Sequence, residues 1–198
     1  MALRDPDKTR NRILTVAAHI FHQKGYNCTS LSDILHASEM SKGALYHHFS
    51  NKEDLLFAVV EEVYQEQFLS PWREVLNTES PMNAMAEVVE NNGKNDTNEA
   101  MCVGCPIYNL AGELSAINDG LRQRVDTIFR NLFNIIHEAI EMAKKANQVD
   151  ASVDSERVSL LILSSLNGMP QIVKSCLDRN MFRQLNGALA DYIRSFCK

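Results

Sequence analysis

The chain has 198 residues, of which 45% are apolar, and its formal net charge is −5. This length and composition suit a globular protein with a buried core, and no apolar run approaches the roughly 18 residues that a membrane span needs. The net acidity argues against nucleic-acid binding, yet residues 1–55 carry a net charge of +1 and the remainder carries −6. The small positive balance is therefore confined to the start of the chain.

Charged residues stand at the N-terminus, where a signal peptide would place an apolar stretch, so we expect no export. The five cysteines are an odd number, which is typical of free thiols in a reducing compartment. We therefore expect a cytoplasmic protein that does not enter a membrane.

Apolar residues recur with a helical period in nearly every segment, which predicts an all-α fold. The first helix is predicted to begin at Pro6 and to end at Gly25. The second begins after Thr29 or Ser30, and Ser30 with Asp33 resembles a capping box. A tight turn over residues 37–40 then leads to a third helix.

Two further helix starts are marked by Ser41 and by Ser50, the latter paired with Glu53 in a second capping box. Three short helices within about 45 residues, the last two joined by a tight turn, predict a helix-turn-helix unit. The fourth helix carries an apolar surface broad enough to serve two cores, and Pro71 should bend or break it.

Later segments repeat the same signals of proline at a helix start and helical apolar spacing. The polar, turn-rich residues 91–100 predict a loop between them. The expected helices begin at Pro81 and Pro106 and then span residues 119–146, 154–177 and 181–197.

Helical geometry divides the third helix into two faces. Leu45 and Phe49 share the inward face and should anchor the helix to its domain. His47 and His48 fall on different sides, so we do not expect them to act together as a metal site or an acid–base pair. Small residues let a partner approach, and the polar side chains are donors for phosphates and base edges. The outward face consists of Gly43, Ala44, Tyr46 and His47.

A series of motifs covers residues 9–56. In order, they are an apolar-Ala-Ala-x-x-Phe run, Gly25-Tyr26, Thr29, Ile34, Ser41-Lys42-Gly43, Leu45-Tyr46, Phe49 and Lys52-Glu53-x-Leu55. Together they resemble the DNA-binding domain of the TetR/AcrR family of bacterial transcriptional regulators. One departure lies at residues 36–40, where the family usually has a small-Gly-Val turn; it should alter the turn without removing it.

The resemblance implies an N-terminal three-helix helix-turn-helix domain, residues 1–52, and a larger helical domain, residues 53–198, for effector binding and dimerisation. It implies a homodimer, formed through the last two helices, that represses transcription from a pseudo-palindromic double-stranded DNA operator and is released by a small-molecule effector. No cofactor is expected. The DNA-binding residues on this interpretation are Thr29, Ser30, Ser41, Lys42, Gly43, Ala44, Tyr46, His47 and Lys52.

Two observations on the last helices favour the dimer independently. The stretch "VSLLILSSLNGM", residues 158–169, is apolar almost all round, with small residues that permit close helix contact. A helix buried on both sides needs a second covering surface, which a partner subunit supplies. The final helix offers a matching stripe, although a wholly intramolecular core explains the same pattern. That stripe consists of Leu185, Leu189, Ile193 and Phe196.

Cys102 and Cys105 form a Cys-x-x-Cys pair that is open to several interpretations. A zinc site needs about four ligands, and no second Cys/His pair is nearby, so no metal is expected. Cys105 precedes Pro106 at a helix start, where a thiolate is favoured. The alternative function is therefore a repressor that senses electrophiles or oxidants through these thiols. The other interpretation is that the two cysteines have no chemical role and are small, partly buried residues in a turn.

The segment "GCPIYNLAGEL" also resembles a motif in one subset of TetR-like regulators, in which the cysteine-containing helix borders the effector cavity. Aromatic, methionine and amide side chains on apolar helices are the candidates for effector contact, although plain core packing explains them too. No set of nucleophile, base and orienting group is readable, so we do not expect an enzyme. The effector candidates are Tyr64, Phe68, Trp72, Met101, Cys105, Tyr108, Asn109, Phe129, Phe133, Asn167 and Met169.

Overall fold

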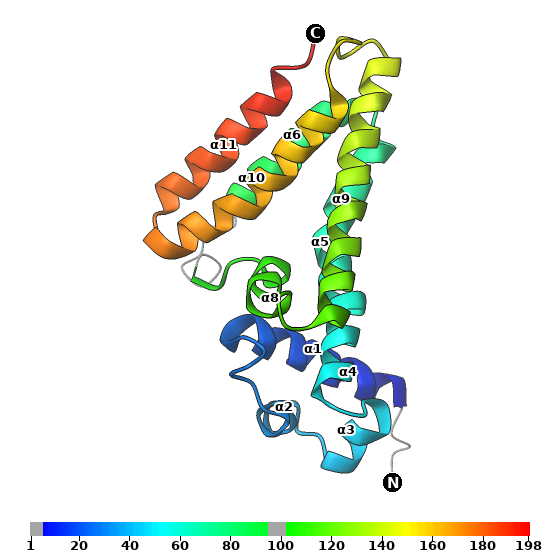
Figure 1. The fold of residues 1–198 in the computed structure, drawn as a ribbon, viewed down its shortest axis with the longest axis vertical. Helices are drawn as coiled ribbons and strands as arrows, with labels where there is room; N and C mark the ends of the chain where they lie inside the picture. The colour runs from blue at the N-terminus through cyan, green and yellow to red at the C-terminus, as the bar shows by residue number, and fades with distance from the viewer. Residues whose placement is uncertain (1–5, 95–101) are drawn as a thin grey trace. The chain divides into compact units, whose positions relative to one another are not determined.

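The computed structural model describes residues 6–94 and 102–198, and the predicted all-α fold is confirmed over those ranges (Figure 1). No helix in the described ranges is long and apolar enough to cross a bilayer. The elements in chain order are α1 (Pro6–Lys24), α2 (Leu31–Ser38), α3 (Lys42–His48), α4 (Lys52–Val59), the π-helical η1 (Val60–Tyr64), α5 (Gln65–Arg73), the 3₁₀-helical η2 (Glu74–Asn77), α6 (Pro81–Lys94), α8 (Pro106–Leu114), α9 (Asp119–Lys145), α10 (Ser155–Cys176) and α11 (Arg179–Arg194).

Packing divides the chain into two compact units. The first, called here the head unit, comprises the described residues up to Gln67 together with Cys105–Asp126. The second, the distal unit, comprises the described residues of Phe68–Gly104 together with Thr127–Lys198. Helices α5 and α9 each begin in the head unit and end in the distal unit. The division of function predicted at residue 52 stays a prediction.

The core of the head unit is built by the apolar stripe of α1 and by side chains from α2, α3 and α4. Burial of such side chains contributes about 2–3 kcal/mol each, which offsets the weak intrinsic stability of helices this short. Arg10 on α1 also pairs with Glu62 on η1 through two contacts of 2.6 and 2.5 Å. The buried set includes Ile13, Leu14, Ala17, Phe21, Ile34, Leu45, Phe49, Leu55 and Leu56.

The N-terminal cap of α4 lies one residue later than the sequence predicted. Asn51 Oδ1 accepts the amide of Asp54 at 2.8 Å, and the Asp54 carboxylate accepts the amide of Ser50 at 2.9 Å. The predicted Ser50–Glu53 capping box is therefore wrong by one position. Asparagine is at least as good a cap as serine, so the two adjacent candidates could not be separated by residue type.

The predicted long fourth helix is continuous but changes its hydrogen-bond pattern twice. The π-helical η1 follows α4, and such turns are often found at functional sites. Tyr64 at the end of η1 is buried, and its hydroxyl donates to the Ala18 carbonyl of α1 at 2.5 Å. Pro71 lies inside α5, which ends at Arg73 and gives way to η2.

In the distal unit, α11 packs along α6, and α10 lies beside α11 (Figure 1). The close approach of α6 and α11 depends on Gly93, where an added Cβ would lie 2.9 Å from Asn186 Cβ. Asn186 is buried and donates its amide to the Phe182 carbonyl at 2.8 Å. An ion pair of 2.5 Å between Arg194 and Glu90 joins the same two helices.

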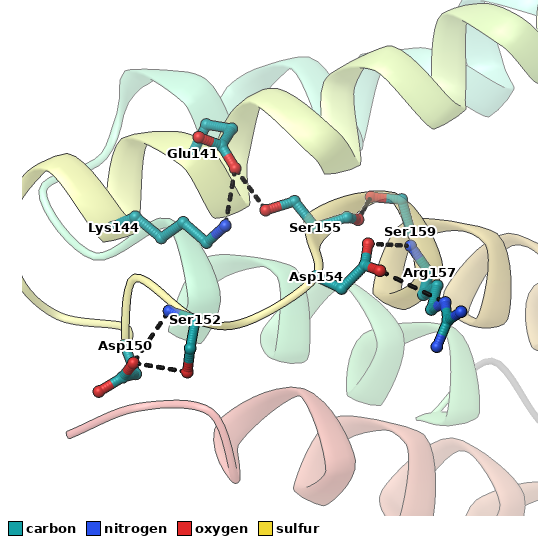
Figure 2. A network of polar contacts seen from close by, with 8 residues as sticks. All are labelled: Glu141, Lys144, Asp150, Ser152, Asp154, Ser155, Arg157 and Ser159. Carbon is teal, nitrogen blue, oxygen red and sulfur yellow. Dashed lines mark hydrogen bonds and ion pairs between the residues drawn. The ribbon is translucent and has the colours of Figure 1, made fainter.

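Polar contacts close the connection between α9 and α10 (Figure 2). The hydroxyl of Ser155, at the start of α10, donates to the Glu141 carboxylate on α9. Asp154 caps α10 by accepting the amide of Arg157 at 3.1 Å. Asp150 accepts the amide two residues later at 2.9 Å, which forms the turn between the helices. This end of the distal unit is therefore fixed by local capping.

The predicted helix starts at Pro81 and Pro106 are confirmed. Helix α6 runs to Lys94, into the stretch predicted as a loop, and residues 95–100 of that stretch lie outside the described residues. The last three helices are α9, α10 and α11, and each lies within three residues of its predicted bounds.

The turn between α2 and α3 is kept despite its unusual sequence. Glu39 ends α2 in the left-handed conformation, with φ of 59°, which glycine adopts more readily than any residue with a Cβ. Its amide donates to the His36 carbonyl at 3.3 Å, and the Met40 amide donates to the Leu35 carbonyl at 3.3 Å. This pattern satisfies the end of the helix, but a residue with a Cβ is strained there.

We predict that Glu39→Gly raises the free energy of unfolding by about 1 kcal/mol relative to Glu39→Gln, because glycine removes the left-handed strain. The glutamine variant is the matched control, since both substitutions remove the exposed 3.6 Å ion pair with Arg12. Urea denaturation measures the difference. Equal midpoints for the two variants would show that the turn carries no such strain.

Candidate nucleic-acid interface

Helix α3 is capped and anchored as its sequence predicts. Ser41 accepts the Ala44 amide at 3.2 Å, which fixes the start of the helix. Leu45 is 0% exposed and Phe49 is 2% exposed, so these two side chains fix how the helix is rotated about its axis. The opposite face is left to solvent: Lys42, Gly43, Tyr46 and His47 are exposed, and Ala44 is half-buried.

The exposed face of α3 combines an open backbone with polar and aromatic side chains. An added Cβ at Gly43 would meet nothing within 4 Å, so a partner has access to the backbone there. Tyr46 is 46% exposed, and the Lys42 ammonium lies 5.8 Å from its ring centroid. Together these features give a small-residue first turn followed by hydrogen-bond donors, which suits entry into a DNA major groove.

His47 and His48 differ in exposure, as predicted, but their rings still touch, with centroids 4.9 Å apart. Burial lowers the pKa of the half-buried His48, and the positive charges of His47 and Arg10 lower it further. Within residues 6–94 and 102–198, no group of three or more His, Cys, Asp or Glu side chains could hold a metal ion.

Three other predicted DNA-binding residues have partners inside the head unit. Ser30 caps α2 and forms a complete capping box with Asp33. Thr29 is buried, and its hydroxyl donates to the Gly25 carbonyl at 2.7 Å. The Lys52 ammonium donates to the Tyr26 carbonyl at 2.5 Å. Contact of these three residues with DNA stays a prediction; the structure gives each of them a role in holding the loop or helix at which it lies.

The predicted effector residues are divided between the two units. Tyr64, Cys105, Tyr108 and Asn109 belong to the head unit, and the distal unit holds the others that the structure describes. Met101 lies outside the described residues. The distal members are Phe68, Trp72, Phe129, Phe133, Asn167 and Met169.

Aromatic rings gather on one side of α9 in the distal unit. Phe129 and Phe133 are half-buried, and the Phe129 ring centroid lies 6.5 Å from that of Phe68. Sequence reasoning missed His137, one turn beyond Phe133, whose ring stacks on it at 5.9 Å. The spacing of Phe129, Phe133 and His137, four residues apart each time, was the signal that could have found it. Asn167 differs from its expected burial, since it lies exposed on α10.

Cys105 does not have the activated thiol that its place at a helix start predicted. It occupies the cap position before α8, but burial raises the pKa of its thiol to about 11 and outweighs the amides of Ile107 and Tyr108, which favour the thiolate. The expectation of a lowered pKa is therefore wrong. A thiol with this pKa is almost fully protonated near pH 7 and is a poor nucleophile.

An all-helical chain with a capped, two-sided α3 after a tight turn defines a helix-turn-helix protein. Two family models match it: "Bacterial regulatory proteins, tetR family" over residues 13–59, and "Tetracyclin repressor-like, C-terminal domain" over residues 81–188. The chain belongs to the TetR family, and it is a DNA-binding transcriptional regulator.

Known relatives agree with this assignment. An uncharacterized HTH-type transcriptional regulator in the lacX 3′ region of Lactococcus lactis subsp. lactis is 29% identical over 133 residues, which are 66% of this chain and 67% of that protein. YxaF of Bacillus subtilis, also an uncharacterized HTH-type regulator, is 28% identical over 163 residues. The matched residues make up 81% of this chain and 82% of YxaF. A TetR regulator from Chloroflexus aurantiacus has a similar crystal structure, with a TM-score of 0.84, 25% identity and 98% of each chain covered.

We predict that Cys105 reacts with iodoacetamide far more slowly than the exposed Cys102 at pH 7, and that its rate rises with pH toward a midpoint of about 11. The sign follows from the raised pKa: the half-buried thiol stays protonated until the pH approaches that value, and only the thiolate attacks. Variants that keep either Cys102 or Cys105 as the single cysteine, followed by mass spectrometry, measure both rates. A fast reaction of Cys105 at pH 7 would contradict this description.

Proposed function

We propose that this protein is a ligand-responsive transcriptional repressor that acts in the cytoplasm, binding a pseudo-palindromic operator as a homodimer and leaving it when a small effector binds. The observation that carries the proposal is the anchored α3, whose exposed face offers Lys42, Tyr46 and His47 beside an open Gly43. In a helix-turn-helix protein the second helix of the motif reads base edges in the major groove.

The side chains of α3 divide into two roles on this proposal. Tyr46 and His47 lie beyond the first turn and are assigned to base edges, where they supply hydrogen bonds. Lys42 and Ser41 stand at the start of the helix, where a phosphate is favoured by the helix dipole and by the free amides. Ala44 and Gly43 allow the backbone to approach the groove.

We predict that Tyr46→Ala and His47→Ala each weaken operator binding by about 1–3 kcal/mol, because each removes a base contact. Lys42→Ala should weaken binding to all sequences and reduce the salt slope by about 1, since it removes a phosphate contact. Fluorescence anisotropy on the intergenic DNA upstream of the protein's own gene, over a series of salt concentrations, measures both quantities.

The control for these variants is His19→Ala, which alters an exposed residue of α1 outside the helix-turn-helix surface. It should bind as the wild type does. Binding of wild-type protein that does not respond to salt would contradict a phosphate-contacting interface and with it the proposed function.

The proposed dimer uses the exposed apolar face of α10. Leu161 and Ile172 are 48% and 51% exposed, and Ser164 and Gly168 lie between them on the same helical stripe. A Cβ at Gly168 would meet nothing within 4 Å, so a second helix has room to approach. An apolar stripe of this kind on a single chain is typical of a protein–protein interface.

Helix α11 contributes less to this surface than its sequence indicated. Leu189 and Ile193 are buried within the distal unit, where α11 packs along α6. Part of the predicted dimer stripe is thus intramolecular core, the alternative that the sequence left open. The proposed partner contacts of α11 are then on its other sides, where Met181 is 37% exposed and Ala188 is exposed.

We predict that Leu161→Arg converts the dimer to a monomer, because it places a charge in the centre of the apolar stripe, while the exposed side chain is not needed for folding of the chain. Operator affinity should fall by about 100-fold or more, as two linked heads bind far more tightly than one. Analytical ultracentrifugation measures the oligomeric state. Glu156→Arg, on a different side of the same helix, is the control and should remain dimeric.

Effector binding is assigned to the half-buried aromatic side chains. Within the distal unit, part of each ring is exposed to solvent at Phe68, Phe129 and Phe133. A small apolar molecule that packs against these rings would bury the exposed apolar surface. Phe68 lies on α5, and Phe129 and Phe133 lie on α9, two helices whose first residues belong to the head unit. An effector that binds one conformation of the protein more tightly than another shifts the population toward that conformation. The difference in effector affinity between the two conformations limits the change in operator affinity.

A further inference from the structure

The segment Cys105–Asp126 is remote in sequence from the helix-turn-helix residues, yet it belongs to the same compact unit. Its helix α8 packs against α1 and η1. One side chain of α8, Glu113, reaches the loop that connects α1 to α2. Neither the predicted DNA interface nor the predicted effector set includes this residue.

The Glu113 carboxylate is held by two consecutive backbone amides of that loop. Its Oε2 accepts the Tyr26 amide at 3.1 Å, and its Oε1 accepts the Asn27 amide at 2.7 Å. The loop is shaped for this: Gly25 has φ of +82°, and a Cβ there would lie 3.2 Å from Glu113 Oε2. Hydrogen bonds from amides to a carboxylate are about twice as strong as bonds between neutral groups.

A charge of opposite sign holds the other side of the same loop. The Lys52 ammonium donates to the Tyr26 carbonyl at 2.5 Å and lies 4.0 Å from the Tyr26 ring centroid. Tyr26 therefore has an anion from α8 at its amide and a cation from α4 at its carbonyl. Both contacts restrain one residue of a loop that has no secondary structure of its own.

Two later side chains of the segment contact α4 and η1. Asn118 donates its amide to the Glu53 carboxylate at 2.7 Å. Arg124 pairs with Glu61 at 2.7 Å and lies 3.9 Å from the Phe57 ring centroid. These contacts hold the end of the segment on α4 and η1, and Glu113 connects α8 with the loop.

The α1–α2 loop determines where the helix-turn-helix motif begins. Thr29 closes the loop through its bond to the Gly25 carbonyl, and Ser30 then caps α2. A displaced loop would carry the start of α2 with it, and α3 follows α2 through a turn of only a few residues.

We propose that Glu113 is a positioning residue for DNA binding, whose carboxylate fixes the α1–α2 loop and thereby the start of α2 and the placement of α3. The effect on DNA binding rests on the proposed function, in which α3 contacts the operator. The positioning role itself is measurable on the free protein.

The experiment compares full-length Glu113→Ala and Glu113→Gln with wild type by hydrogen-exchange mass spectrometry without DNA, and by anisotropy on the labelled upstream intergenic fragment. Glu113→Ala should speed exchange in residues 25–38 and weaken DNA binding about tenfold, the effect of losing a charged hydrogen-bond pair. The salt slope should not change, because no phosphate contact is lost. Glu113→Gln retains one acceptor, so its exchange rate and its DNA affinity should lie between those of wild type and Glu113→Ala.

Gly112→Ala is the matched control on α8, since its added Cβ would meet nothing within 4 Å, and it should match wild type in both measurements. Circular dichroism establishes whether each variant is folded. If Glu113→Ala does not fold, the exchange and binding measurements on Glu113→Gln decide the question. Unchanged exchange in the loop, or faster exchange with unchanged operator affinity, would overturn the role of Glu113 and leave the proposed function standing. Wild-type protein without salt-dependent DNA binding would overturn both.

Discussion

The burial of two side chains, Leu45 and Phe49, is the contact on which the proposed DNA-binding surface depends. Helix α3 has only seven residues, and a helix of that length is unstable in water without tertiary contacts. Its two apolar anchors therefore supply both its stability and its rotation about its own axis. Turning the helix to present another face would expose both anchors, at a cost of about 2–3 kcal/mol for each. The guanidinium of Arg10 lies 5.3 Å from the Phe49 ring centroid, while its ion pair with Glu62 holds it in place. The face of α3 that is proposed to meet DNA is thus determined by what the opposite face buries.

Backbone conformation between the helices is fixed by polar contacts of a different kind. The α1–α2 loop is held at Tyr26 by Lys52 and Glu113, and the α2–α3 turn tolerates a left-handed Glu39 because its amides are satisfied. Such contacts contribute little to stability when they are exposed, but they restrict where a helix can begin. The apolar core explains why the head unit folds. The polar contacts explain why α2 and α3 are presented in one arrangement, which is what sequence recognition requires.

Local chemistry made most of the fold and the α3 surface readable from the sequence. Proline starts, serine caps and the wheel of α3 depend on residues within one or two turns, so their signals are contained in short stretches. The predictions that failed, and the contacts that were missed, depend on residues far apart in the sequence or on burial. Glu113 and Tyr26 are separated by 87 residues, and nothing in either stretch identifies the other. At Cys105 the local rule for a helix start was outweighed by burial, a property of the whole unit. Asn167 was assigned to the interior because its helix is apolar, whereas the exposed side of α10 is itself apolar.

The charge distribution supports the proposal that operator binding needs two heads. Several cations of the head unit are engaged within it: Arg10 with Glu62, Arg12 with the Ser38 carbonyl, and Lys52 with Tyr26. Each phosphate that a protein contacts adds to the counterion release that drives association, so a head with few available cations gains little from this term. In the proposed dimer, two heads joined through α10 would sum their contacts at a high effective concentration, and the gain would be lost when their spacing did not match the operator. On the proposed function, the shortage of positive charge that favours dimerisation would also make binding sensitive to small changes in head geometry, which is the property that an effector-controlled repressor needs.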